Sequence, residues 1–125
     1  MHRDLNKITQ KIIECAINVH RELGPGLLES TYETCLEYEL LKNDLKVERQ
    51  KELPVVYKDK KIDCGYRIDL LVEDLIIVEL KSADRLEPIH TAQILTYMKL
   101  SKQPLGLLIN FNVKLLKTGI KRVIL

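Results

Sequence analysis

The sequence predicts an α/β domain in which a small mixed sheet is flanked by helices. Three observations support this fold class. The apolar spacing changes from helical to strand-like and back along the chain, in the order α-α-β-β-β-α-β-β. The chain has 125 residues, the length of one domain, so we expect residues 1–125 to fold as a single unit. The composition, 46% hydrophobic and 30% charged, argues against a disordered or fibrous chain.

The first predicted helix covers residues 5–23. Its apolar residues recur at helical spacing, and Asp4 precedes them as the expected N-cap. Gly24, Pro25 and Gly26 end this helix, because Gly tolerates left-handed backbone angles and Pro disfavours a helical residue before it.

The start of the second helix is open to two interpretations. An apolar stripe predicts a helix from about Leu28 to Asn43. Ser30 and Glu33 have the spacing of a capping box, which would start the helix after Ser30 and make Glu33 structural. Glu29 would then lie just outside the helix. In the longer helix it lies in the first turn, where a carboxylate is also favoured by the helix dipole.

The middle of the chain predicts an antiparallel meander. The expected strands and turns are residues 47–57, 58–60 (turn), 61–72, 73–74 (turn) and 75–81. Pro54 indicates an edge or a bulge in the first strand, because proline has no N–H to donate. The third strand is almost wholly apolar and is expected at the centre of the sheet.

Three elements are predicted after the meander. Residues 86–100 return to helical spacing, with Pro88 tolerated in the first turn. Residues 105–110 form a short apolar strand, expected to be buried, and residues 119–125 form a last strand.

Charged residues interrupt two of the predicted strands. Asp69 lies among apolar residues of the second strand, and Glu79 and Lys81 end the third. Because strand side chains alternate between faces, Glu79 and Lys81 share a face. A buried carboxylate or ammonium group costs desolvation energy unless it is paired or binds an ion.

The turn between these strands decides whether the two acids meet. A three-residue loop, 73–75, pairs Asp69 with Glu79 on one face, whereas a two-residue loop pairs Asp69 with Val78. In the first register the carboxylates repel each other, and a hard cation such as Mg²⁺ would relieve this. Lys81 could then orient or deprotonate a water, or neutralise charge on a phosphate. The alternative is a structural ion pair at a sheet edge.

The helix that follows carries a polar stripe. His90, Gln93 and Tyr97 lie at positions i, i+3 and i+7, on one side of the predicted helix. They could contact phosphates or bases, or they could form a half-buried polar border.

Cysteine spacing and the distribution of charge bear on which metal sites and binding partners are expected. Cys15, Cys35 and Cys64 form no close pair, so we expect three reduced, packed thiols and no zinc or iron–sulfur site. All 18 acidic residues lie within residues 1–98, whereas six of the 20 basic residues lie within residues 99–125. This basic end could hold a polyanion, or it could be a solvated lysine-rich surface. The sequence lacks a membrane-length apolar run and a secretory signal, so a cytoplasmic protein is expected.

Five motifs follow one another along the chain: Gly26-x-x-Glu29-x-x-Tyr32, Gly65-Tyr66-Arg67-Ile68-Asp69, Glu79-Leu80-Lys81, His90-x-Ala92-Gln93-x-x-x-Tyr97 and Leu107–Phe111. Together they resemble the GxxExxY proteins of the PD-(D/E)xK nuclease superfamily. The resemblance implies a restriction-endonuclease-like αβββαβ core, here preceded by an extra N-terminal helix. It also implies Mg²⁺-dependent hydrolysis of nucleic acid phosphodiesters, with DNA the expected substrate and Mn²⁺ a plausible substitute ion.

The same resemblance implies a role for each matching residue. Asp69 and Glu79 would bind the metal together with the Leu80 carbonyl oxygen, and Lys81 would be the catalytic lysine. Glu29 would assist the metal or the water and is a further candidate ligand. One departure from the motif is Ile68, which stands where a proline often precedes the aspartate.

The polar stripe has an implied role as well. Gln93 and Tyr97 would orient Lys81 or the substrate, with His90 as a further substrate contact. Two alternatives on the same fold are a catalytically silent nucleic-acid-binding module and a partner-regulatory module. A homodimer or a protein partner could supply specificity, since a short chain has little room for a recognition domain.

Overall fold

The computed structural model describes residues 4–125, and two helices open the fold. In α1 (Leu5–Leu23), the Asp4 carboxylate accepts the Asn6 and Lys7 N–H groups, which confirms the predicted N-cap. Gly24 ends α1 at a φ of 72°. Helix α2 (Glu29–Lys42) begins at Glu29, the longer of the two predicted helices, so the Ser30 capping box does not form.

Five strands form the main sheet. They are β1 (Val47–Glu52), β4 (Arg67–Val72), β5 (Ile76–Lys81), β6 (Leu105–Asn110) and β7 (Ile120–Ile124), and they lie in the order β1-β4-β5-β6-β7. Only β5 and β6 are parallel, and α3 (Pro88–Ser101) connects them; a 3₁₀ turn, η1 (Leu116–Gly119), precedes β7. The predicted mixed sheet and the order αβββαβ after an extra first helix are confirmed.

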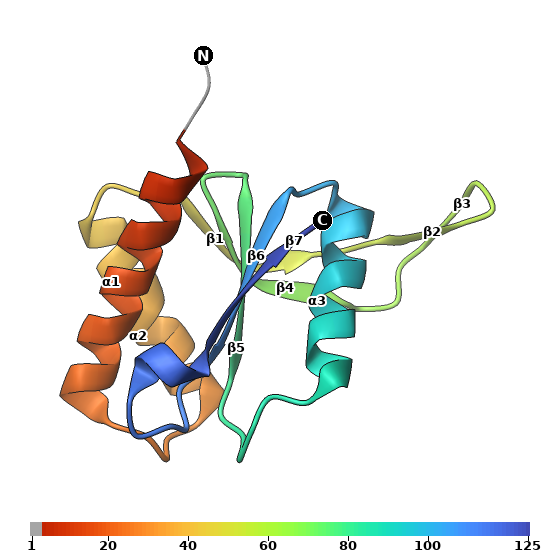
Figure 1. Cartoon of the computed structure of the whole chain (residues 1–125). Helices are drawn as coiled ribbons and strands as arrows, with labels where there is room; N and C mark the ends of the chain where they lie inside the picture. Colours follow the sequence, from red (N-terminus) through yellow and green to blue (C-terminus); the bar gives the residue numbers. More distant parts are fainter. Residues whose placement is uncertain (1–3) are drawn as a thin grey trace.

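Two predicted long strands are wrong, because each is broken in the structure. Residues 47–57 divide into β1 and β2 (Val55–Tyr57) at Pro54, which cannot donate to a ladder. Residues 61–72 divide into β3 (Lys60–Ile62) and β4, and Gly65 between them has a φ of 75°. Strands β2 and β3 pair only with each other and project from the body as a hairpin, residues 55–62, hereafter the arm (Figure 1).

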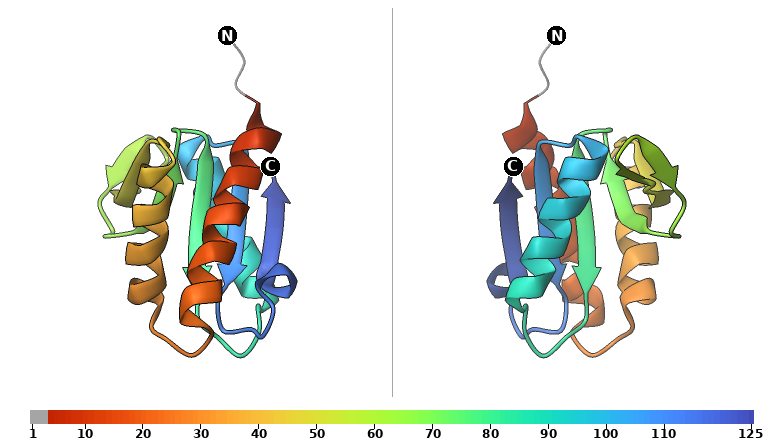
Figure 2. Two further views of the ribbon diagram at one scale, coloured as in Figure 1. Left: turned by 90° about the vertical axis from the view of Figure 1, so that its left-hand side faces the viewer. Right: turned by 90° about the vertical axis from the view of Figure 1, so that its right-hand side faces the viewer.

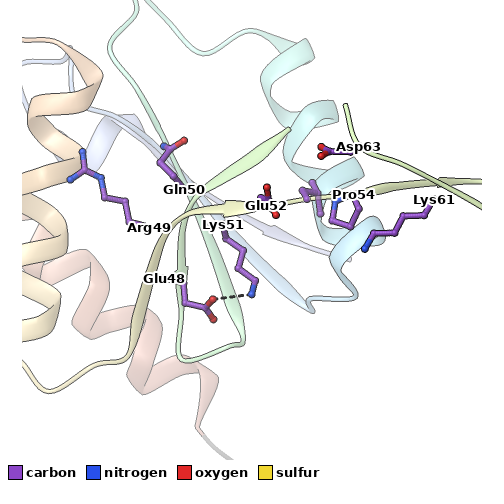
Figure 3. Close-up of a pocket in the computed structure, with 9 residues that line it drawn as sticks. Glu48, Arg49, Gln50, Lys51, Glu52, Pro54, Lys61 and Asp63 are labelled. Atoms are coloured by element: carbon purple, nitrogen blue, oxygen red, sulfur yellow. Dashed lines mark hydrogen bonds and ion pairs between the residues drawn. The ribbon is translucent and has the colours of Figure 1, made fainter. Parts of the chain in front are cut away.

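A polar hollow of about 810 Å³ lies between β1 and the base of the arm (Figure 3). Its lining comes from β1, from the turn into the arm and from the arm's second strand and exit: Glu48, Arg49, Gln50, Lys51, Glu52, Leu53, Pro54, Lys61 and Asp63. The break in the predicted strand therefore creates a concave surface beside the sheet.

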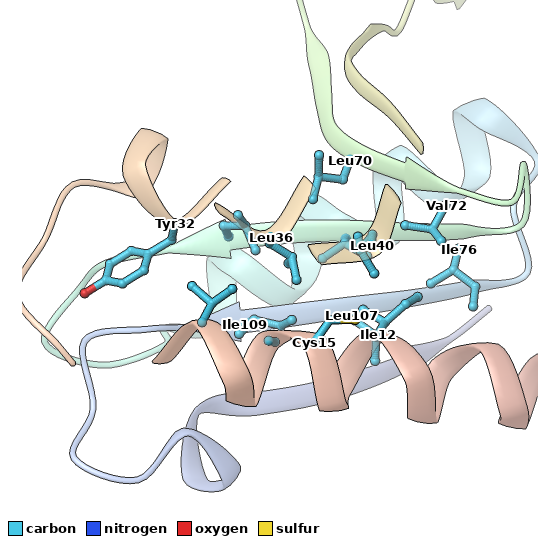
Figure 4. Packing of buried hydrophobic residues seen from close by; sticks show 14 of the residues in the cluster. Ile12, Cys15, Tyr32, Leu36, Leu40, Leu70, Val72, Ile76, Leu107 and Ile109 are labelled. Atoms are coloured by element: carbon cyan, nitrogen blue, oxygen red, sulfur yellow. The ribbon is translucent and has the colours of Figure 1, made fainter. Parts of the chain in front are cut away.

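The sheet separates two hydrophobic clusters. Helices α1 and α2 cover one face and α3 covers the other (Figures 1 and 2). On the first face, fully buried residues of both helices interlock with alternate residues of the central strands, as Leu36, Leu70 and Leu107 do in Figure 4. All six residues of β6 are buried, as predicted for that strand.

Gly106 allows α3 to pack closely on the second face. A Cβ atom at this position would lie 2.9 Å from both Ile94 Cδ1 and Met98 Sδ. The absence of a side chain on β6 therefore sets how near α3 can approach the strand.

The cysteines and the late basic residues do not gather into a site. All three thiols are free, but only Cys15 is buried; Cys64 is exposed, so the prediction of three packed thiols is wrong for it. Burial raises the pKa of the Cys15 thiol above its ordinary value. Lys102 precedes β6 and Lys114 follows it, so these two lysines lie at opposite ends of that strand, whereas Lys121 and Arg122 lie on β7 beside its middle.

Candidate active site

Strands β4 and β5 separate where the two acidic residues lie. Their pairs are Leu70 with Val78, Leu71 with Ile77, and Val72 with Ile76. The connection is therefore the three-residue loop 73–75. Extended by one position beyond the last pair, this register places Asp69 opposite Glu79. Of the two registers the sequence left open, the one that brings the acids together is confirmed.

The two carboxylates hold the strands together beyond the last pair. The Asp69 N–H donates to Glu79 Oε2 at 2.8 Å, and the Leu80 N–H donates to Asp69 Oδ2 at 2.9 Å. Each carboxylate thus accepts a hydrogen bond from a backbone N–H of the other strand. In a regular ladder, a backbone carbonyl oxygen would accept this bond. These bonds fix both carboxylates at one point of the sheet.

The ionised forms of both acids are disfavoured by their surroundings. Glu79 is 5% exposed, and burial, followed by the negative charge of Asp69, raises its pKa to about 8. Burial also raises the pKa of Asp69, while its bond from the Leu80 N–H opposes the shift. The charge of Lys81 lowers the pKa of both carboxyl groups, and so the lysine stabilises their ionised forms.

Lys81 is positioned by the end of β5. It shares a face with Glu79 by strand alternation, and its backbone pairs in parallel register with Asn110 of β6. The Phe111 N–H donates to the Lys81 carbonyl oxygen at 2.9 Å. The buried Asn110 amide bonds both backbone groups of Ala83, which anchors the loop that follows the lysine.

Glu29 lies at the edge of this site. It occupies the first turn of α2, where Glu29 Oε2 accepts the Ser82 N–H at 3.4 Å. The Ser82 hydroxyl donates to the Leu27 carbonyl oxygen at 2.6 Å. These contacts join the start of α2 to the chain one residue beyond Lys81, and the charge of Glu29 helps to raise the pKa of Asp69.

Tyr32, the last residue of the Gly26 motif, is structural. It is fully buried, and its ring stacks on Phe111 with centroids 4.4 Å apart. Its hydroxyl donates to the Gly24 carbonyl oxygen at 2.6 Å and accepts the Leu27 N–H at 3.1 Å. Tyr32 therefore shapes the loop that leads into Glu29.

Two polar residues near the acids, Glu33 and Gln50, were not among the predicted site residues. Glu33 is 6% exposed and lies 2.9 Å from Arg49 Nε, and Gln50 Nε2 donates to Glu33 Oε1 at 2.7 Å. Gln50 Nε2 also lies 3.4 Å from Asp69 Oδ1, and its backbone has a φ of 53°. Glu33 follows Glu29 by one helical turn, and this spacing was the available signal. No signal in the sequence singled out Gln50.

The hollow beside β1 adjoins the carboxylates through Gln50. This residue lines the hollow (Figure 3), and its side-chain amide also contacts Asp69. A left-handed φ in a non-glycine residue is strained, and such strain is common at functional sites.

Two of the three residues in the predicted polar stripe of α3 contact each other, and the third lies apart from them. Gln93 Nε2 donates to the Tyr97 hydroxyl at 3.3 Å, so these two residues meet as expected. Burial raises the pKa of Tyr97, and the charge of Glu79 raises it further. His90 lies at the helix start instead, where Nδ1 accepts the Glu87 N–H at 2.9 Å.

The donor set suits a hard divalent cation. Two carboxylates whose ionised forms are disfavoured by burial and mutual repulsion gain stability when a cation neutralises them. Among residues 4–125, no group of three or more His, Cys, Asp or Glu side chains is arranged to enclose a metal ion. A cation at Asp69 and Glu79 would therefore complete its coordination with backbone oxygen, water or substrate, as Mg²⁺ commonly does.

Comparison with known proteins gives one match. The family model of the PD-(D/E)XK nuclease superfamily matches residues 6–123. No curated protein and no solved structure matches the chain. Within the described part of the chain, no helix has the length and apolarity to cross a membrane. The three helices and the five-stranded mixed sheet fit the restriction-endonuclease-like fold, and the chain belongs to the PD-(D/E)XK nuclease superfamily.

Proposed function

We propose that this protein is a divalent-metal-dependent nuclease of the GxxExxY group that hydrolyses phosphodiester bonds, with DNA as the expected substrate. The observation that carries the proposal is the exchange of backbone hydrogen bonds between Asp69 and Glu79, with Lys81 on the same face. A purely structural ion pair would not require two buried carboxylates to face each other.

Each residue has an assigned task in this proposal. Asp69, Glu79 and the Leu80 carbonyl oxygen hold Mg²⁺, or Mn²⁺ in its place. When bound, such a cation supplies Lewis-acid activation of a phosphodiester and neutralises its charge. Lys81 orients the attacking water and neutralises charge that develops on the phosphate.

Three further residues support the same centre. Glu29 assists from the edge at the start of α2, close to the chain after Lys81. Tyr97 and Gln93 form a hydrogen-bonded pair next to the acids and orient the substrate phosphate or Lys81. His90 bonds to the backbone of the α3 start and has a smaller part in substrate contact.

The test is a cleavage panel with matched variants. Wild-type protein with Mg²⁺ or Mn²⁺ is expected to cut DNA, and Lys81→Ala is expected to reduce the rate at least about 100-fold because one charge-stabilising group is lost. Lys117→Ala removes an exposed lysine of η1 and is expected to leave the rate unchanged. Equal rates for wild type and Lys81→Ala would contradict the proposal.

Calorimetry separates metal binding from chemistry. Wild type is expected to bind Mn²⁺ with measurable heat, and Asp69→Asn is expected to lose most of that binding, with thermal unfolding confirming that the variant folds. Salt-dependent DNA binding without cleavage in any metal would instead identify a catalytically silent binding module.

A further inference from the structure

An exposed aromatic ring lies directly beside the candidate active site. Tyr66 precedes β4 by one residue and Asp69 by three, and 48% of its surface is exposed. Its backbone is fixed, because the Leu53 N–H at the base of the arm donates to the Tyr66 carbonyl oxygen at 2.9 Å. The backbone that carries the ring is therefore anchored where the chain leaves the arm and enters the strand that carries Asp69.

A second tyrosine links this ring to the acids. The rings of Tyr66 and Tyr97 have centroids 6.3 Å apart and planes inclined by 61°, an edge contact. Tyr97 is 8% exposed, and its pKa is raised by burial and by the charge of Glu79. An edge contact covers only part of the Tyr66 ring, so an exposed aromatic surface remains next to Tyr97.

Positive charge flanks the same surface. Arg67 follows Tyr66, and its guanidinium lies 3.6 Å from Glu52 in an exposed pair, a contact that contributes little and that a phosphate can displace. The arm projects on the α3 side of the sheet and carries Lys58, Lys60 and Lys61 (Figures 1 and 2). Lysines on such an arm can contact the phosphates of a nucleic acid strand independently of its sequence.

We propose that Tyr66 is a stacking platform for an unpaired nucleobase next to the phosphate that is cut. This inference deepens the proposed nuclease function and rests on it for the identity of the ligand. Every nucleobase has a π-face that an aromatic side chain can stack against, so the contact is independent of sequence. In a paired duplex both faces of each internal base are already covered, so Tyr66 selects a single-stranded or frayed segment.

The binding experiment uses a fluorescein-labelled single-stranded DNA with a single 2-aminopurine, in buffer that contains EDTA and no divalent metal. Tyr66→Ala is expected to weaken binding about 5- to 150-fold, the range for loss of one base–aromatic stack. It is also expected to abolish the 2-aminopurine quenching that stacking produces, whereas Tyr66→Phe retains both. Binding of a blunt duplex is expected to change little in either variant.

Two further variants separate stacking from folding and from general surface effects. Tyr66→Leu keeps an apolar contact with Tyr97 but cannot stack, so it is expected to bind as weakly as Tyr66→Ala while unfolding at the wild-type temperature. Tyr38→Ala removes a tyrosine of similar exposure, 63%, from α2 on the opposite side of the sheet, and is expected to bind like wild type.

The outcomes distinguish the platform from the nuclease function. Equal affinity and quenching for Tyr66→Ala and Tyr66→Phe would overturn the platform, whether or not the protein cuts DNA. Tyr66-dependent quenching in a protein that never cuts DNA would support the platform and overturn the nuclease proposal. A wild-type protein that binds neither single-stranded nor duplex DNA would overturn both.

Discussion

Replacing Glu79 by glutamine is expected to stabilise the metal-free protein at neutral and alkaline pH. The pKa of Glu79 is raised from its ordinary 4.5 to about 8, mainly by burial and then by the charge of Asp69. Between these two pH values the folded state holds a proton that the unfolded state has released. The free energy of unfolding therefore falls as pH rises from about 4.5 to about 8.

The magnitude follows from the size of the shift. Each pH unit inside the window reduces the free energy of unfolding by up to about 1.4 kcal/mol, so the whole window amounts to about 3–5 kcal/mol. The glutamine carbonyl oxygen can still accept the Asp69 N–H, but it carries no charge that burial opposes. Above pH 8, Glu79→Gln is expected to melt about 10 °C or more above wild type.

The assay is thermal unfolding by circular dichroism at pH 5 to 9 in EDTA, with both proteins in identical buffers. Glu22→Gln removes an exposed charge from α1 and serves as the control, with a small shift that is expected to be constant across this range. Added Mn²⁺ is expected to raise the melting temperature of wild type most at high pH, because a cation binds the ionised acids, and to raise that of Glu79→Gln less. A difference between wild type and Glu79→Gln that stays constant from pH 5 to 9 would refute the reasoning.

Two further predictions concern stability. Tyr32→Phe removes a hydroxyl bonded to two backbone groups of the loop before α2, and it is expected to cost about 1–3 kcal/mol in urea unfolding, whereas Tyr38→Phe, at an exposed ring, is expected to cost almost nothing. Gly119→Ala places a Cβ against the Asn110 carbonyl oxygen, which is backbone and cannot move aside; Gly106→Ala meets only side-chain atoms of α3. We therefore expect Gly119→Ala to lower the melting temperature more, and equal losses would contradict this ranking.

The elements with strong periodicity could be predicted from the sequence. Helix α1 and strand β6 agree with their predicted bounds, because an amphipathic stripe and a short apolar run each have one stable arrangement in a domain of this size. The breaks inside the predicted long strands could not be placed. Pro54 indicated a disruption, but nothing local shows that the next ladder pairs only within a hairpin and leaves the main sheet.

In the candidate site, too, some residues could be predicted from the sequence and others could not. Asp69, Glu79 and Lys81 could be found because burying a charged group costs desolvation free energy. Charged residues within an apolar strand therefore stand out in the sequence. The positions of Tyr66 and Gln50 beside these acids could not be found in this way, because they depend on contacts with elements distant in the sequence. The Tyr66 ring contacts a ring on α3, and the Gln50 side chain contacts carboxylates on α2 and β4.

The position of Gln50 gives a physical reason for the shape of the site. Strand β1 pairs with β4 on both sides of this residue, through Arg49 with Leu70 and Lys51 with Ile68, while Gln50 itself adopts a φ of 53°. Asp69, the residue opposite Gln50 in this register, bonds through its own N–H to Glu79 on β5. The ladders on both sides of β4 are thus interrupted at the same residue. At this interruption the Asp69 and Glu79 carboxylates, rather than backbone carbonyl oxygens, accept the N–H groups of the facing strand, so two acids can lie side by side within the sheet.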